Sequence, residues 1–247
     1  MSHTVGVLYP GYSAEDDFPA IERILGHDVR LPLAHTKMRE DAHRVDALLD
    51  VGSRAVLAEG VQQLKATSPQ AVVWACTSGS FVFGWAGAQS QVRHISSAAG
   101  VPASSTSFAF VEAARHLGLR RVSVAATYPC DVASHFVDFL QFAGVEVVHL
   151  ASRGIVTAAE VGTMQGREVI KFAKANNHPH ADAVLIPDTA LHTVHWLNDL
   201  ELSLEKPVLT ANQVSAWMGL QLAGYKGRCE RLGLLFRAPR ASLTTAG

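Results

Sequence analysis

Three segments from the first half of the chain recur in the second half, in the same order and at similar spacing. The matching pairs are Val5–Pro10 with Val122–Pro129, Ala71–Ser78 with Ala183–Ala190, and Val101–Thr106 with Lys206–Ala211. Each is a short apolar run that ends in turn-forming or hydroxyl-bearing residues. Because three ordered matches are better explained by duplication than by chance, the chain is predicted to contain two similar lobes.

The first lobe is predicted to span residues 1–118 and the second residues 119–225, followed by a C-terminal tail, residues 226–247. The boundary falls near Leu117–Arg121, between a predicted helix and a predicted strand. The prediction leaves open that the C-terminal segment crosses back to the first lobe.

Short β-branched runs alternate with amphipathic stretches of helical length along the chain. The predicted strands are Val5–Tyr9, Val29–Ala34, Ala71–Ala75, Pro102–Ser104, Val122–Ala126, Glu146–Leu150, Ala183–Ile186 and Pro207–Leu209. The predicted helices are Arg54–Lys65, Gly87–Ala98, Phe108–Leu117, Val132–Ala143, Thr157–Ala175, Leu191–Leu200 and Gln213–Ala223. Such alternation is typical of parallel sheets covered by helices. We therefore predict an α/β fold of two Rossmann-like lobes, related by a pseudo-twofold axis, with the active site in the cleft between them.

The composition restricts the classes of function that are expected for this chain. The chain has 247 residues, of which 48% are hydrophobic, and a formal net charge of -1, which argues for a globular protein without nucleic-acid or membrane partners. No apolar run is long enough to span a bilayer, and no signal-peptide pattern is present, so a cytoplasmic protein is expected. Because no glycine-rich phosphate loop follows the first strand, no cofactor is expected.

Neither a disulfide framework nor a metal site is predicted. The three cysteines, Cys76, Cys130 and Cys229, lack paired spacing. His192 and His195 could share one face of a helix, but two ligands without a third make a weak case for zinc.

Cys76 and Asp188 are the candidate catalytic residues. The repeat makes them equivalent, and each ends a predicted strand, where parallel α/β proteins collect their ligands. Facing each other across a cleft, they would supply one proton-transferring group per face of a carbon atom. For Cys76 the alternative is a small buried hydrophobic residue, and for Asp188 it is the cap of the following helix.

Two features of the sequence would shift the pKa of the Cys76 thiol in opposite directions. Backbone N–H groups in the turn at Thr77 and Ser78 would bind an oxyanion and lower the thiol pKa from about 8.5, whereas a nearby Asp188 carboxylate would raise it. Further hydroxyls at strand ends belong to Tyr12, Tyr128 and Thr189.

The duplicated lobes, with Cys76-Thr77-Ser78 at a strand end of one and an acidic or thiol residue in the other, resemble the Asp/Glu racemase superfamily. Within it the chain looks most similar to arylmalonate decarboxylases and maleate isomerases, from Val5 to Gly224. The segment Val72–Phe81 resembles the decarboxylases' first-lobe motif, which has glycine at the position of Cys76.

The resemblance implies that Thr77, Ser78 and Tyr128 hold a substrate carboxylate and that Pro10 belongs to the same pocket. Tyr12 and Thr189 complete the predicted binding residues. A small mono- or dicarboxylate is the implied substrate, and a homo-oligomer is a possible assembly by analogy.

The chain also departs from the family pattern. Racemases and maleate isomerases carry one cysteine per lobe and the decarboxylase keeps only the second, whereas this chain has Cys76 in the first and Asp188 in the second. We therefore expect a cofactor-independent enzyme that forms a carbanion or enediolate next to a carboxylate, with Cys76 as proton donor in a decarboxylation. Maleate isomerisation, amino-acid or hydantoin racemisation, and non-catalytic carboxylate binding are the alternatives.

Overall fold

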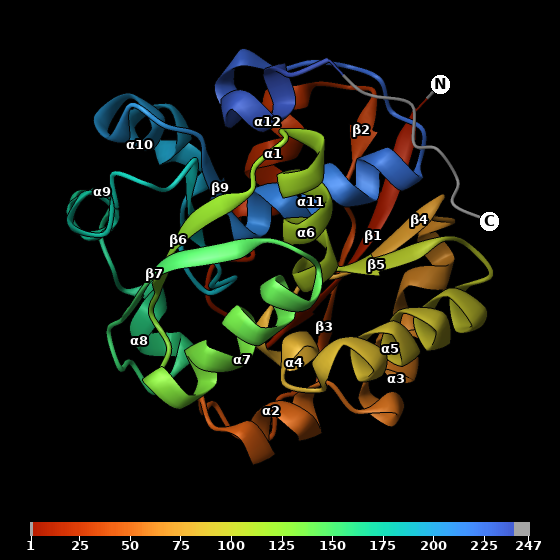
Figure 1. The fold of residues 1–247 in the computed structure, drawn as a ribbon. Coiled ribbons are helices and arrows are strands. Elements are labelled where there is room, and N and C mark those ends of the chain that lie inside the picture. The colour runs from red at the N-terminus through yellow and green to blue at the C-terminus, as the bar shows by residue number, and fades with distance from the viewer. Residues whose placement is uncertain (1, 240–247) are drawn as a thin grey trace.

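Two parallel sheets form the centre of the molecule in a computed structural model, which describes residues 2–239 (Figure 1). The first contains β1 (His3–Pro10), β2 (Val29–Arg30), β3 (Leu33–Thr36), β4 (Ala71–Trp74) and β5 (Ala103–Ser105). The second contains β6 (Arg121–Ala126), β7 (Glu146–Ser152), β8 (Ala183–Ile186) and β9 (Val208–Thr210). Helices cover both sheets, so the predicted α/β class with parallel sheets is confirmed.

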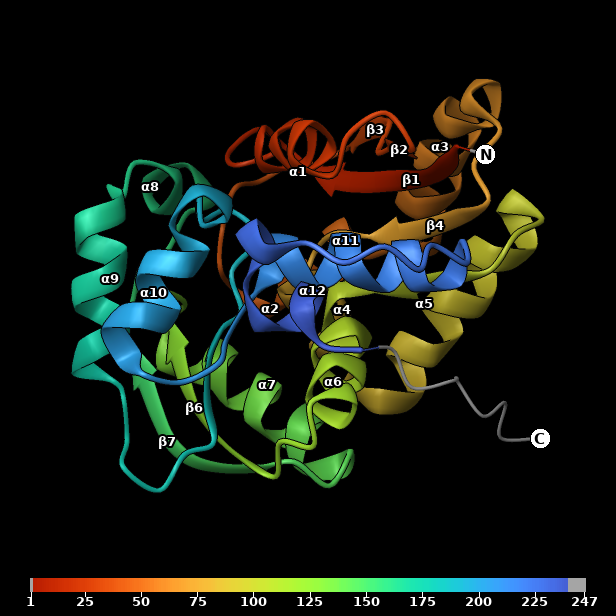
Figure 2. The same cartoon turned by 90° about the horizontal axis from the view of Figure 1, so that it is seen from above.

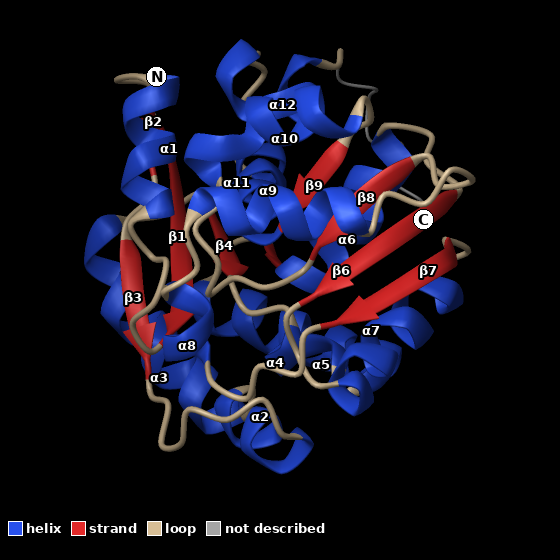
Figure 3. Ribbon diagram, turned by 90° about the vertical axis from the view of Figure 1, so that its left-hand side faces the viewer, coloured by secondary structure: helices blue, strands red, loops and turns tan. Residues whose placement is uncertain are grey.

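The two sheets have the same strand order. In the first, β1 pairs with β2 and β3 on one side and with β4 on the other, and β5 follows β4. In the second the order is β7-β6-β8-β9, and Figure 3 shows the two sets of strands side by side. Strands β4 and β8 therefore hold equivalent places, and the loops that follow them carry Cys76 and Asp188.

Longer helices alternate with the strands, as the periodicity predicts. They are α1 (Asp17–Leu25), α2 (Val45–Val51), α3 (Arg54–Leu64), α5 (Gly84–Ala99), α6 (Thr106–His116), α7 (Cys130–Phe142), α9 (Gly166–Ala175), α10 (Leu197–Leu204) and α11 (Ala211–Leu222). Shorter helical turns are η1 (Lys65–Thr67), α4 (Ser78–Phe81), α8 (Ala158–Gly162), η2 (Val194–Trp196), η3 (Glu230–Leu232) and α12 (Gly233–Arg237).

Three predicted elements are wrong in detail. The strand predicted over residues 29–34 is two strands, because Pro32 has no N–H to donate to a neighbour. The helix predicted over residues 157–175 is two helices, α8 and α9, and the second begins where Glu168 accepts the N–H of Gln165 at 3.0 Å. The helix predicted from Leu191 begins only at Leu197, after a turn and the short η2.

Helix α11 joins the two halves of the molecule. It follows β9, yet it packs against β1, β4 and α6 (Figure 2). Gly219 makes this approach possible, because a Cβ atom there would lie 2.3 Å from Val5 Cγ1. At the same interface the hydroxyls of Ser215 and Thr106 are 2.6 Å apart. The C-terminal part of the chain thus fixes the two sheets relative to each other.

The predicted tail begins with η3 and α12, while residues 240–247 lie outside the described part of the chain. Among residues 2–239, no helix combines the length and the apolar character needed to cross a bilayer.

Candidate active site

Cys76 lies in the loop that joins β4 to α4, and its side chain is buried. Strand β4 is buried along its whole length, and the N–H of Ala75 bonds to the carbonyl of Leu8 on β1 at 2.8 Å. The Cys76 Sγ atom accepts the N–H of Gly79 at 3.3 Å and lies 3.9 Å from Ser78 Oγ. The thiol is therefore held in place by the turn that follows it.

The thiol of Cys76 is protonated at neutral pH. Burial raises its pKa from 9.0 to about 12, and the Asp188 carboxylate adds to this rise. The N–H of Gly79 and the hydroxyl of Ser78 lower the pKa, but by less. Burial, which was not among the two opposing effects suggested by the sequence, dominates the shift, so the thiol is suited to donate a proton.

Asp188 occupies the equivalent place after β8 and faces the same cavity as Cys76. Its Oδ1 atom accepts the N–H of Ala190 at 2.9 Å, and its Oδ2 atom accepts the hydroxyl of Thr127 in a short hydrogen bond. A turn and not a helix follows it, so the side chain does not cap a helix. Both oxygens are engaged within the protein.

Two buried tyrosines, Tyr9 near the end of β1 and Tyr128 after β6, hold the main chain around Asp188. Tyr128 donates its hydroxyl to the carbonyl of Pro187 at 2.7 Å. Tyr9 donates to the carbonyl of Thr189 at 2.9 Å and accepts the N–H of Ala14 at 3.0 Å. Burial raises the pKa of both phenols, so both remain protonated donors.

A cavity joins the two strand-end loops. It measures about 450 Å³ including space open to solvent. Its lining residues are Tyr9, Pro10, Ser13, Met38, Glu40, Asp41, Ala42, His43, Leu48, Val51, Cys76, Ser78, Ala158, Asp188, Thr189 and Ala190. No lysine or arginine is among these described lining residues.

Most of the predicted site residues meet at this cavity. Pro10, Cys76, Ser78, Asp188 and Thr189 line it.

Two other predicted residues lie just behind the lining. Thr77 is fully buried, with a hydroxyl that finds no hydrogen-bond partner in the described part of the chain. The hydroxyls of Thr77 and Ser78 lie close enough to Tyr128 to lower its pKa against the effect of burial.

Tyr12 is placed differently. It is 73% exposed, and its ring stacks on His35 with centroids 4.1 Å apart. It does not belong to the cavity lining.

The segment between β3 and α2 forms one wall of the cavity and was not singled out from the sequence. Asp41 accepts the N–H groups of Ala158 and Ala159 at 2.7 and 2.9 Å. The N–H of His43 bonds to the carbonyl of Val156 at 2.7 Å, and its ring packs edge-on against Tyr128, with centroids 5.0 Å apart. In the sequence, this segment could have been recognised as a polar run that follows a strand, at the edge of the sheet where ligands bind.

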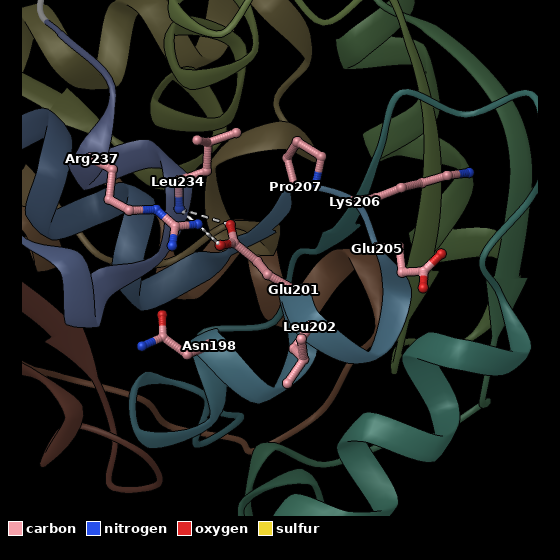
Figure 4. A pocket seen from close by; sticks show the side chains of 8 residues that line it. All are labelled: Asn198, Glu201, Leu202, Glu205, Lys206, Pro207, Leu234 and Arg237. Atoms are coloured by element: carbon pink, nitrogen blue, oxygen red, sulfur yellow. Dashed lines mark hydrogen bonds and ion pairs between the residues drawn. The ribbon is translucent and has the colours of Figure 1, made fainter.

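A larger hollow of about 940 Å³, including space open to solvent, lies elsewhere, between α10, β9 and α12 (Figure 4). Its main polar group, Glu201, already accepts the N–H of Leu234 at 2.8 Å and a guanidinium N–H of Arg237 at 2.6 Å. It is an open surface depression whose central carboxylate anchors the C-terminal segment, so the site is assigned to the Cys76 cavity.

The family model for arylmalonate decarboxylase matches residues 41–236. The chain belongs to this family. The superfamily assignment made from the strand-end motifs is thereby confirmed, and the matched range includes both Cys76 and Asp188.

Curated relatives of the family match over shorter stretches. The maleate isomerase of Alcaligenes faecalis is 24% identical over 148 residues, which are 60% of this chain and 55% of that protein. The arylmalonate decarboxylase of Bordetella bronchiseptica is 28% identical over 132 residues, 51% of this chain and 54% of that protein. The chain thus spans about half the length of the curated relatives it matches.

Solved structures share the whole fold. The maleate isomerase Iso of Pseudomonas putida S16 has a TM-score of 0.85 at 18% identity, with 96% of this chain and 99% of that chain covered. A liganded arylmalonate decarboxylase mutant has a TM-score of 0.82 at 22% identity, with 95% and 99% covered. A Nocardia farcinica maleate cis-trans isomerase mutant with a covalently bound succinylcysteine intermediate scores 0.87 at 18% identity, with 97% and 100% covered.

Within residues 2–239, no group of three or more His, Cys, Asp or Glu side chains is placed to hold a metal ion.

Proposed function

We propose that this protein is a cofactor-independent decarboxylase of the arylmalonate decarboxylase type, with Cys76 as the proton donor. The observation that carries the proposal is a thiol held protonated in a cavity lined by hydroxyl groups. A decarboxylation needs one proton donor, because the departing carbon dioxide leaves its bonding electron pair on the α-carbon.

The steps of the reaction can be assigned to residues. The retained carboxylate of a malonate binds near the hydroxyls of Thr77 and Ser78. When the bond to the second carboxylate breaks, its electron pair delocalises into the retained carboxylate as an enediolate, which these hydroxyls stabilise. The Cys76 thiol then transfers its proton to the α-carbon, and the resulting thiolate recovers a proton from water.

Maleate isomerisation is the second candidate, because a curated relative is a maleate isomerase. A nucleophilic attack on the double bond requires a thiolate, and a thiol with a pKa of about 12 disfavours that form. Racemisation requires a base opposite Cys76, and both oxygens of Asp188 already accept hydrogen bonds. The protonated state of the Cys76 thiol and the hydrogen bonds of Asp188 therefore support decarboxylation.

The test is to incubate the protein with substituted malonates, maleate, aspartate and hydantoins in deuterium oxide and to follow the products by NMR. We expect loss of carbon dioxide from a malonate and incorporation of one deuteron at the α-carbon. Replacing Cys76→Ala should lower the rate by about 10²–10⁴-fold, the usual contribution of a positioned acid. Cys130→Ala, at an exposed thiol, is the matched control.

Other results would redirect the assignment. Conversion of maleate to fumarate would favour the isomerase, and deuterium exchange into aspartate or a hydantoin would favour a racemase. Thermal stabilisation by carboxylates without any turnover would favour a carboxylate-binding protein. Full activity of the Cys76→Ala variant would remove Cys76 from the mechanism.

A further inference from the structure

The two strand-end loops differ in which of their polar groups are free. In the first half, the Ser78 hydroxyl lines the cavity and lies 3.9 Å from Cys76 Sγ, while the buried Thr77 hydroxyl lies against Tyr128. In the second half, the Ala190 N–H and the Thr127 hydroxyl both bond to Asp188. A donor that faces the cavity, the Ser78 hydroxyl, is thus present in one half, whereas two donors of the other half are used by the protein itself.

Asp188 is bound as a ligand carboxylate would be. One of its oxygens takes a backbone N–H in the turn after a strand, and the other takes a buried hydroxyl, which is the donor set that proteins commonly offer to carboxylates. Ser13 adds no further donor, because its hydroxyl bonds to the carbonyls of Ala158 and Ala190 at 3.0 Å each. Thr189, the residue after Asp188, also lines the cavity on this side.

The charges around the cavity reinforce this asymmetry. The described lining contains no lysine or arginine, and the side chains of Glu40 and Asp41 are engaged by Arg44 and by the N–H groups at the start of α8. A second carboxylate placed next to Asp188 would meet a like charge without a compensating cation, and like charges brought together in a partly desolvated site repel strongly.

We propose that the Asp188 carboxylate fills the carboxylate-binding position of the second half, so that the cavity accepts ligands with carboxylate at one end only. A ligand with a carboxylate at each end, such as maleate or succinate, is rejected. This inference rests on the proposed function in that it defines the substrate class: monocarboxylates, and malonates whose two carboxylates share one carbon atom.

The experiment compares equilibrium binding of butyrate and succinate, two four-carbon acids that carry one and two carboxylates, by calorimetry at pH 7.5. We expect the unmodified protein to bind butyrate at least about tenfold more tightly than succinate, because like charges oppose the second carboxylate. The Asp188→Ala variant, in which the Ala190 N–H and the Thr127 hydroxyl become free, should reverse this order. Asp188→Asn, which keeps the size and removes the charge, should give an intermediate succinate affinity.

The unmodified protein decides the question even where a variant fails to fold. Binding of succinate as tight as that of butyrate, or binding of neither, would overturn the inference. The proposed function fails separately, through absence of malonate turnover or through full activity of Cys76→Ala. The preference for butyrate requires no turnover and should persist in Cys76→Ala.

Discussion

The loop after β4 and the loop after β8 come from matching places in two similar sheets, yet they use their polar groups in opposite ways. Residues 76–79 present a protonated thiol and the Ser78 hydroxyl to the cavity. Residues 187–190 present a carboxylate whose oxygens are satisfied, on a main chain held by two tyrosines. The two sheets share their strand order, while the residues at the two strand ends differ in their hydrogen bonding.

The difference shows why a repeat predicts the place of a site better than its chemistry. Strand order and strand ends follow from apolar runs that both halves retain. The reactivity of a strand-end residue depends on burial and on neighbours that come from other elements, such as Thr127 after β6 for Asp188.

The largest expected effect concerns the reactivity of the thiol. With a pKa of about 12, Cys76 is almost wholly protonated at pH 7.5, so its alkylation by iodoacetamide should be on the order of 10³-fold slower than that of a thiol with an ordinary pKa of about 8.5. The rate should keep rising about tenfold per pH unit from pH 8 to pH 11, because the thiolate fraction grows until the pH reaches the pKa.

Mass spectrometry separates alkylation at Cys76 from alkylation at the exposed Cys130. Asp188→Asn should speed the reaction at Cys76, because it removes a charge that raises the thiol pKa. A rate that levels off near pH 9 would show that burial does not dominate, and the loop after β4 would then hold a nucleophile.

The second effect concerns the tyrosines that hold the Asp188 loop. Tyr128→Phe leaves the buried carbonyl of Pro187 without its donor, and Tyr9→Phe leaves the N–H of Ala14 without its acceptor. Each should lower the free energy of unfolding by about 1–3 kcal/mol, the cost of one unsatisfied buried group. Urea denaturation followed by circular dichroism measures the loss.

Tyr12→Phe is the matched control, because the Tyr12 ring is 73% exposed, and it should change stability by less than about 0.5 kcal/mol. An equal loss in all three variants would mean that hydrogen bonds to the Asp188 loop contribute nothing particular. A loss of stability in Tyr128→Phe alone would show that the loop is stabilised by the hydrogen bond from Tyr128 and not by those of Tyr9.

Much of the fold and the centre of the site could be predicted from the sequence. The repeat placed Cys76 and Asp188 at equivalent strand ends, and both line one cavity. What was missed lacks a local pattern. The wall formed by Met38–His43 has neither helical nor strand periodicity, and its place is fixed by hydrogen bonds to residues 155–159, more than a hundred positions along the chain. Tyr12 was predicted to bind substrate because it follows β1, but the turn at Gly11, with φ of 62°, directs its ring onto His35.

The smallest effect tests that wall, where the two halves meet. Asp41→Asn keeps the size of the side chain but removes the charge that accepts the N–H groups of Ala158 and Ala159. An amide oxygen can replace only one of these charge-assisted hydrogen bonds, so we expect a loss of about 1 kcal/mol in the free energy of unfolding. Glu40→Gln is the neighbouring control, since Glu40 makes an exposed ion pair with Arg44, and such pairs contribute about 0–1 kcal/mol.

If the two variants lose equal stability, the contact between Asp41 and α8 is no stronger than a surface ion pair. A larger loss in Asp41→Asn, with an increased KM for the substrate, would show that this contact holds the cavity wall in place.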